Sequence, residues 1–220
     1  MIDIPNDPTL DELRSALAPL VARNAAFDGW RAAAVANAAA QAQVDPAIAQ
    51  LAFGDGPVAM IDAWFASVDA EMTARLPAET LAAMKIRERI AALVEARLDI
   101  LAPDRESLRR ALNILAMPQN MPRSVKLGWR AADAMWRLAG DVATDYNHYS
   151  KRTILGGVYA ATLLAFIDDE SEGQAETRAF LARRIDGIMR FEKAKAGLIP
   201  DKDRRLSLSR FIGRLRYPAV

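Results

Sequence analysis

The sequence predicts an all-α protein, and two features lead to that fold class. The first is composition: 52% of the 220 residues are hydrophobic, with many alanines and few β-branched or aromatic runs, which favours helices. The second is periodicity, because apolar residues recur at spacings of three and four between short stretches that contain Pro, Gly or Asp. A chain of this length can bury a substantial core.

Four helices are expected in the first 75 residues. A capping box at Thr9 and Glu12 starts the first, and Pro46 and Pro57 stand at the first positions of the third and fourth. The expected ranges are 10–24, 30–43, a short segment after residue 45, and 57–75. Three short helices followed by a longer one resemble the helix-turn-helix head of a TetR-type repressor.

The charges of this head argue against DNA binding. No Lys or Arg occurs between Arg31 and Arg75, and the net charge of the whole chain is only +1. The same window contains Asp45, Asp55, Asp62, Asp69 and Glu71. Because phosphate contacts supply much of the affinity for DNA, an acidic head would be repelled by it. We therefore expect a degenerate head that binds no nucleic acid.

The body is expected to contain further helices separated by clear breaks. Pro77 opens a long amphipathic helix to Leu98, whose charged residues, Arg97 among them, are expected on a solvated face. Helices over 105–117 and 123–138 follow, with a firm break at 118–122 and another near 144–147. An acidic, solvated turn at 168–173 precedes a last helix that Gly197 and Pro200 end.

The stretch from Leu138 to Glu170 organises the rest of the chain. Its second half, from Thr153 to Ile167, is free of charge. As a helix it would span roughly 22 Å, short of the ~30 Å of a bilayer core, which indicates burial in protein. It is expected to be either a plain core helix or a core helix that lines a lipid-sized cavity. The candidate lipid-binding residues are Trp129, Trp136, Leu155, Gly157, Val158, Tyr159, Leu163 and Leu164.

The C-terminal tail has an amphipathic pattern. Apolar residues at helical spacing form one stripe, with arginines over much of the remainder, which suits a helix lying in an anionic membrane interface. A terminal helix that docks on the body or on a second subunit is the alternative. The candidate membrane-binding residues are Leu208, Phe211, Ile212, Leu215, Arg210 and Arg214.

Few catalytic or metal-binding sites are compatible with the composition. The chain has no Cys and a single His, which excludes disulfides, thiolate ligands and zinc sites built on several imidazoles. Asp145-x-x-His148 resembles half of a carboxylate–histidine iron site, but a di-iron bundle needs a second such pair. We expect no catalytic residues, no metal, no cofactor and no enzymatic activity.

A polar and aromatic cluster precedes the charge-free segment. Were the helix continuous, Asp141, Asp145, His148 and Arg152 would lie on one face, with Tyr149 beside them. Exposed aromatic and oppositely charged groups suit a protein-docking patch. Local caps and salt bridges explain the same residues equally well.

Taken together, several motifs resemble the ubiquinone (coenzyme Q) biosynthesis accessory proteins that form the ninth member of the Coq series. The resemblance covers about residues 26 to 190 and is most specific from Gly140 to Arg152. The motifs are Phe27-Asp-Gly-Trp30, Leu51-Ala-Phe-Gly-Asp-Gly56, Lys85-Ile-Arg-Glu-Arg-Ile90, Arg97-Leu98, Pro118-x-Asn120-x-Pro122, Asp133-x-x-Trp136, Gly140-Asp141-x-x-Thr144-Asp145, Tyr149-x-x-Arg152, Val158-Tyr159 and Phe180-Leu-x-Arg-Arg-Ile185.

The resemblance implies a TetR-like bundle that has lost DNA binding, forms homodimers and meets the membrane through its C-terminal helix. It also implies a hydrophobic pocket for an isoprenoid quinone intermediate or a phospholipid, which is presented to a di-iron hydroxylase. The docking residues of the family correspond to Asp141, Asp145, Tyr149 and Arg152. This chain departs from the family at His148, where Trp is usual.

The expected organisation is one domain over 1–200, with a head at 1–75 and a body at 76–200, followed by the amphipathic helix 203–217. The N-terminal residues resemble neither a signal nor a transit peptide, so we expect a bacterial cytoplasmic protein, peripheral to the inner membrane. Two rival functions stay open: a TetR-type regulator that senses an apolar ligand, and a membrane-associated scaffold without a ligand cavity.

Overall fold

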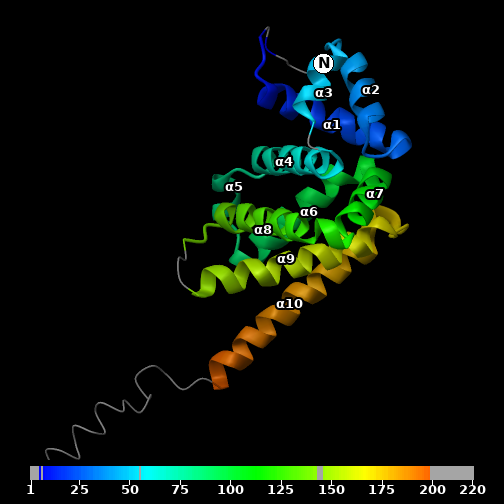
Figure 1. Ribbon diagram of the computed structural model, residues 1–220. Helices are drawn as coiled ribbons and strands as arrows, with labels where there is room; N and C mark the ends of the chain where they lie inside the picture. The colour runs from blue at the N-terminus through cyan, green and yellow to red at the C-terminus, as the bar shows by residue number, and fades with distance from the viewer. Residues whose placement is uncertain (1–4, 6, 55, 143–145, 199–220) are drawn as a thin grey trace, which may run out of the picture. The chain divides into compact units, whose positions relative to one another are not determined.

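The computed structural model describes residues 5, 7–54, 56–142 and 146–198, and within these ranges all regular secondary structure is helical (Figure 1). The expected all-α class is confirmed. The α-helices are α1 (Leu10–Asp28), α2 (Ala32–Ala42), α3 (Pro46–Ala52), α4 (Pro57–Arg75), α5 (Ala78–Ala82), α6 (Ile86–Leu101), α7 (Arg105–Leu115), α8 (Met121–Leu138), α9 (Tyr146–Ile167) and α10 (Ala175–Leu198). Short 3-10 turns lie at η1 (Ala102–Asp104), η2 (Pro118–Asn120) and η3 (Glu172–Gln174).

The chain divides into two compact units, Met1–Leu181 and Ala182–Val220. The division falls inside α10, earlier than the expected domain end at residue 200. Of the second unit, the structure describes only the part of α10 up to residue 198. The proposed membrane segment lies outside the described residues, with all of its candidate positions: Leu208, Phe211, Ile212, Leu215, Arg210 and Arg214.

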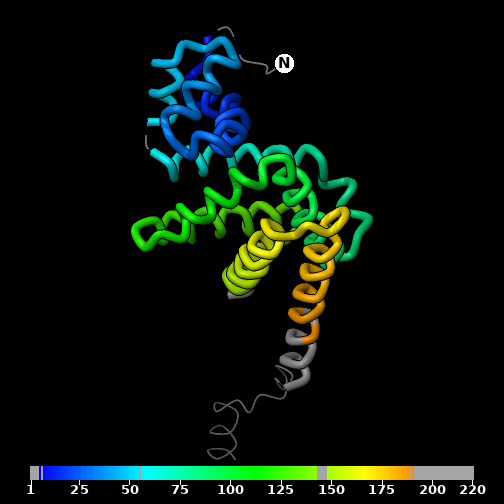
Figure 2. Tube along the Cα trace, turned by 90° about the vertical axis from the view of Figure 1, so that its right-hand side faces the viewer, coloured from blue at the N-terminus to red at the C-terminus, as the bar shows by residue number. Residues whose placement is uncertain are grey.

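The head consists of α1 to α4, and α1 to α3 gather at one end of the first unit (Figures 1 and 2). The predicted start signals are confirmed. The Thr9 hydroxyl accepts from the Glu12 N–H at 3.3 Å, while the Thr9 N–H donates to the Glu12 carboxylate at 2.9 Å. Asp45 caps α3 by accepting from the Ala47 N–H at 2.7 Å. These local bonds satisfy N–H groups that have no partner inside their helices.

Trp30 joins the head to the body. Its ring is buried and lies 5.3 Å from the ring of Trp64 on α4, centroid to centroid. Its indole N–H donates to the backbone carbonyl of Ser107 on α7 at 3.1 Å. The Ser107 hydroxyl in turn donates to the carbonyl of Ala22 on α1 at 2.5 Å. Head and body therefore share one core rather than forming separate domains.

The expected helix from Pro77 to Leu98 is two helices, α5 and α6, with a break at 83–85. The Arg89 side chain lies across this break and donates to the carbonyls of Ala82, Met84 and Ala139, at 3.1, 2.9 and 2.8 Å. One guanidinium thus satisfies carbonyls that lack helical partners after the ends of α5 and α8. Residue 139 is far along the chain, so the periodicity of residues 77–98 carries no sign of this bond.

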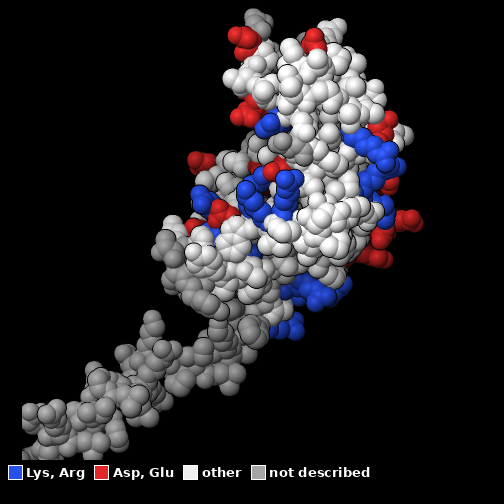
Figure 3. Space-filling view, viewed as in Figure 1, with Lys and Arg blue, Asp and Glu red and all other residues white. Residues whose placement is uncertain are grey.

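The sequence predicted Arg97 on a solvated face because its neighbours are charged, and this prediction is wrong. Arg97 is fully buried, donates to the Tyr159 hydroxyl at 2.9 Å and forms an ion pair with Asp69. Asp69 also lies 3.4 Å from Arg130, which pairs with Asp62. Two of the carboxylates that made the head acidic are therefore neutralised by body arginines. The seven residues of α3 carry no charge and lie on a largely uncharged surface (Figure 3).

The acidic turn after α9 was expected to be solvated, but part of it is buried. Asp169 is buried, and its carboxylate accepts from the N–H and hydroxyl of Ser171 at 2.8 and 2.5 Å and from those of Thr177 at 2.8 and 2.6 Å. Burial raises the pKa of Asp169, but these four hydrogen bonds outweigh it and hold the pKa well below its usual value. The carboxylate thereby caps the start of α10.

The helices α8 and α9 pack closely along each other (Figure 2). Gly156 lies at this contact, where a Cβ would still be in ordinary van der Waals contact, 3.8 Å from the carbonyl oxygen of Gly128 and 4.0 Å from the Ala132 side chain. Larger side chains at residue 156 would push the two backbones apart. None of the described helices is both long enough and apolar enough to cross a membrane.

Candidate functional site

The candidate lipid-binding residues of α9 lie on two opposite faces of the helix. Leu155, Tyr159 and Leu163 recur every four residues and are buried in the core. Gly157 and Leu164 point outward: a Cβ on Gly157 would meet nothing within 4 Å, and Leu164 is 59% exposed. Val158 is half-buried between these faces. Positions 155 and 157 differ by roughly 200° around a helix, so these residues do not share one face, and their role in lipid binding stays a prediction.

The two candidate tryptophans have separate surroundings. Trp136 donates its indole N–H to the carbonyl of Lys151 at 3.0 Å, and the Lys151 ammonium lies 5.3 Å from the centre of its ring. Trp129 lies beside the first turns of α9, with ring centroids 5.9 Å from Tyr149 and 6.3 Å from His148. Trp136 thus fastens α8 to α9, while Trp129 belongs to a surface group.

We name Trp129, His148 and Tyr149 the aromatic cluster. The rings of His148 and Tyr149 are 5.2 Å apart and nearly perpendicular. Tyr149 is 61% exposed, and the other two members are partly exposed. Aromatic rings held in place by one another present a large apolar area at little entropic cost. The sequence assigned the members of this cluster to different sites, Trp129 to lipid binding and both His148 and Tyr149 to docking.

An ion-pair network lies beneath the cluster. The Arg152 guanidinium contacts Asp133 at 2.6 Å and Asp141 at 3.0 Å, and Asp141 also accepts from Lys151 at 2.6 Å. The side chains of Arg152 and Asp141 are only 2% and 5% exposed. Burial raises the pKa of Asp141, but the bonds to Lys151 and Arg152 outweigh it and lower that pKa from its usual value.

This burial corrects the expectation that Asp141 and Arg152 are exposed docking residues. Within the expected patch, Tyr149 and partly His148 are accessible, whereas Asp145 lies outside the described residues. The network joins the end of α8 to the start of α9, and Arg152 also donates to the carbonyl of His148 at 3.1 Å. Its charges therefore hold the aromatic cluster in position rather than forming its outer surface.

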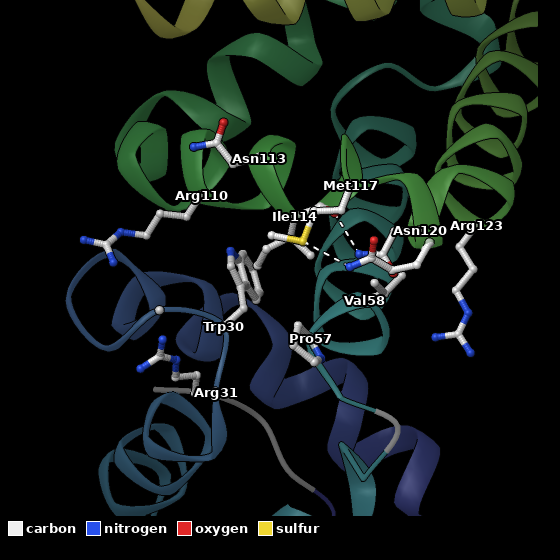
Figure 4. Close-up of a pocket in the computed structure, with 12 residues that line it drawn as sticks. Trp30, Arg31, Pro57, Val58, Arg110, Asn113, Ile114, Met117, Asn120 and Arg123 are labelled. Atoms are coloured by element: carbon white, nitrogen blue, oxygen red, sulfur yellow. Dashed lines mark hydrogen bonds between the residues drawn. The ribbon is translucent and has the colours of Figure 1, made fainter.

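A separate pocket of about 560 Å³ lies between head and body, all within the first unit. It is built from the turn before α2, the start of α4, and α7 with the connection to α8 (Figure 4). None of the eight candidate lipid-binding residues lines it. The lining residues are Gly29, Trp30, Arg31, Pro57, Val58, Arg110, Asn113, Ile114, Met117, Gln119, Asn120 and Arg123.

Two sequence motifs supply part of the lining of this pocket. The motifs Phe27-Asp-Gly-Trp30 and Pro118-x-Asn120-x-Pro122 were singled out as family-like, and each supplies lining residues. Nothing in their spacing indicates that they meet, since roughly ninety residues separate them along the chain. Only the tertiary packing of α7 against the head brings them together.

One comparison with known proteins concerns the region of the aromatic cluster. Residues 121–192, which contain α8 and α9, match the COQ9 family model. The mitochondrial ubiquinone biosynthesis protein COQ9 of Bos taurus is 33% identical over 168 residues, which cover 73% of this chain and 52% of that protein. The corresponding protein of Rattus norvegicus is 44% identical over 96 residues, covering 44% of this chain and 31% of its own length. The chain belongs to the COQ9 family.

These relatives also correct one expectation. The chain spans about half the length of the Bos taurus COQ9 protein and less of the Rattus norvegicus one. The names of both state a mitochondrial location, as does that of the Homo sapiens protein, which is 41% identical over 96 residues. The expected bacterial cytoplasmic location rested on the N-terminal residues alone, and the mitochondrial relatives contradict it.

The fold has its own comparison. The crystal structure of the TetR transcriptional regulator from Nitrosomonas europaea ATCC 19718 superposes with a TM-score of 0.63. The match covers 80% of this chain and 97% of that one at 24% sequence identity. At this identity the likeness shows the fold alone, and it confirms the TetR-like architecture that the order of helices in the head predicted.

Proposed function

We propose that this COQ9-family chain is a non-enzymatic accessory protein of ubiquinone biosynthesis. In this proposal it binds an isoprenoid quinone intermediate and presents it to a di-iron hydroxylase that docks on the aromatic cluster. Membership of the COQ9 family supports a role in ubiquinone biosynthesis. Presentation of the intermediate, and the hydroxylase as the partner, go beyond family membership and are proposed here.

The observation that supports docking most directly is the exposed ring of Tyr149. Its ring lies 5.9 Å from that of Trp129 and 5.2 Å from that of His148, so contacts within the protein, rather than the partner, set its position. A preorganised aromatic anchor loses little freedom on binding, which is why such residues dominate interface energies. The cluster also lies inside the range that matches the family model.

The outer face of α9 supports contact with an apolar molecule. Among the described side chains of α9, the exposed ones carry no charge; they are Tyr149, Thr153, Gly157, Ala160 and Leu164. We name them the outer strip. Small side chains in its middle permit close approach of a flat apolar surface, such as an isoprenoid chain. Its first residue is Tyr149, so a chain bound along the strip would end at the proposed docking site.

The test of docking is capture of the hydroxylase by the full chain. Tyr149→Ala is expected to weaken capture roughly tenfold or more, as loss of an aromatic anchor does. Phe27→Ala is the matched control, because Phe27 is also an exposed aromatic residue but lies on α1. Equal capture by both variants would overturn the proposed docking site. His148→Trp enlarges the cluster and is expected to leave capture intact or to tighten it.

A further inference from the structure

The pocket between head and body carries positive charge without an acidic counterpart. Arg31, Arg110 and Arg123 line it, and none of the twelve lining residues is acidic. Arg110 is paired through its Nε with Glu106, at 3.0 Å on the exposed side of α7. In the part of the chain that the structure describes, Arg31 and Arg123 form no ion pair. Three guanidinium groups around one hollow favour an anion inside it.

Two of these arginines lie beside the same backbone turn. Gly29 has φ of 70°, a left-handed conformation that glycine adopts without steric cost. Arg110 Nη1 and Arg31 Nε each lie 3.9 Å from the point where a Cβ on Gly29 would stand. Both side chains therefore lie at the same backbone turn, one from α7 and one from the residue before α2. Figure 4 shows both on the same side of Trp30, with Arg123 on the other side.

The backbone adds to this positive field. Three helices begin at the pocket: α2 follows Arg31, α4 follows Gly56, and α8 follows Asn120. None of the three has a hydrogen bond from the side chain of its N-cap residue. Helix N-termini carry partial positive charge, which attracts phosphate and carboxylate groups. The first turns of α4 and α8 each contain a proline, which has no N–H, so these two helices contribute mainly the partial charge. Lys and Arg side chains also gather over α7 where it meets the head (Figure 3).

Apart from the arginines and three amide side chains, those of Asn113, Gln119 and Asn120, the lining is apolar. Trp30, Val58, Ile114 and Met117 lie between the two arginine sides in Figure 4. Two of the amides are already occupied: Asn120 donates to the Ile114 carbonyl at 2.8 Å, and Gln119 contacts the Met117 sulfur at 3.5 Å. A ligand that satisfies both kinds of lining has an anionic end and an apolar body. The volume of about 560 Å³ is within the usual range for small-molecule sites.

We propose that this pocket binds a phosphate monoester attached to an apolar group. The phosphate lies between Arg31 and Arg110, whose planar guanidinium groups match its oxygens in bidentate fashion. The apolar part lies over Trp30, Ile114 and Met117. This site is distinct from the outer strip of α9 and does not depend on the proposed function.

The test is calorimetric titration of the full chain with two probes. Dihexanoyl phosphatidic acid, used below its micellar concentration, carries both ligand parts, and inorganic phosphate carries only the anion. Arg31→Gln and Arg110→Gln are each expected to weaken phosphatidic acid binding roughly tenfold, because each removes a charge-assisted contact. Arg75→Gln is the matched control, since Arg75 is an exposed arginine with an i,i+4 partner, Glu71, outside the pocket. It is expected to bind as the wild type does.

The apolar part has its own variant. Met117→Ala is expected to weaken phosphatidic acid binding several-fold and to leave phosphate binding unchanged. Equal affinity for both probes, together with no effect of Met117→Ala, would reduce the site to one for free phosphate and overturn the amphipathic ligand. Absence of binding by either probe, or equal losses in Arg75→Gln and Arg31→Gln, would overturn the site itself. If Arg31→Gln shifts the thermal midpoint, Arg31→Lys is titrated in the same way, because it keeps the charge but loses the planar guanidinium. Weaker phosphatidic acid binding by Arg31→Lys supports the bidentate contact, and unchanged binding contradicts it.

Discussion

Arg152 and Asp141 form a buried ion pair, with 3.0 Å between the guanidinium Nη1 and the carboxylate Oδ2. Asp141 follows the end of α8 and Arg152 lies in α9, so the pair closes the connection between these helices. Asp133 and Lys151 complete the network and balance its charges. A pair this deeply buried contributes to stability only while both of its members are present.

Arg152→Glu is therefore expected to destabilise the protein strongly. It removes the cation and places a third carboxylate beside Asp133 and Asp141, and breaking a buried pair costs about 3–5 kcal/mol. Urea unfolding followed by circular dichroism measures the loss. Arg137→Gln is the control, because Arg137 also pairs with Asp133 but is 72% exposed, and a change within about 0.5 kcal/mol is expected. Similar midpoints for wild type and Arg152→Glu would contradict the internal role of the network.

Asp169 is expected to make stability depend on pH in the acid range. Its folded pKa lies below the ordinary value of 3.8, so its contribution is full above about pH 3.8 and is lost as pH falls toward the folded pKa. At pH 7, Asp169→Asn should lower the free energy of unfolding by about 1–3 kcal/mol, because its amide cannot accept all four hydrogen bonds.

Unfolding curves from pH 7 to pH 2 check this expectation. The difference between wild type and Asp169→Asn should narrow as the medium becomes more acidic. Asp168→Asn serves as the control, because the Asp168 side chain is 70% exposed and paired only with Arg109 in the described part of the chain. A constant difference at all pH values would show that Asp169 acts by packing rather than through its charge.

Gly157→Phe tests the outer strip of α9. The position is open, so the fold is expected to accept the ring, while close approach to the strip becomes blocked. Mass spectrometry of lipids retained by the purified protein should show a loss relative to wild type. Gly187→Phe is a control at another glycine with open surroundings. Retained lipid together with a change from dimer to monomer in sedimentation would assign the strip to subunit contact instead.

The C-terminal segment is expected to bind membranes through its apolar stripe and its arginines together. Phe211→Asp places a charge in the stripe and should remove most co-sedimentation with anionic liposomes. Deletion of residues 203–220 should remove all of it and leave the helical content of the remaining chain unchanged. Undiminished co-sedimentation of the shortened protein would mean that the segment docks on protein.

The sequence by itself determined the local elements of this protein. The capping box of Thr9 and Glu12, the Asp45 cap and a break between α7 and α8 were all predictable, although α8 begins at Met121, inside the predicted break of 118–122. Each depends on bonds between residues at most four apart or on the missing N–H of proline, so the information lies in a short window. The order of helices in the head was enough to predict the TetR-like fold.

Tertiary structure alone decided which polar groups are buried and where the surfaces lie. Arg97 resembles its exposed neighbours in sequence, and only Asp69 and Tyr159, distant along the chain, make its burial favourable. The segment 153–167 is apolar on every side, so no difference in polarity told its core face from its outer strip. The arginine-lined pocket likewise needs α7 packed on the head. Whether a polar group is buried depends on the partners that it finds, and partners far apart in sequence produce no periodic pattern along the chain.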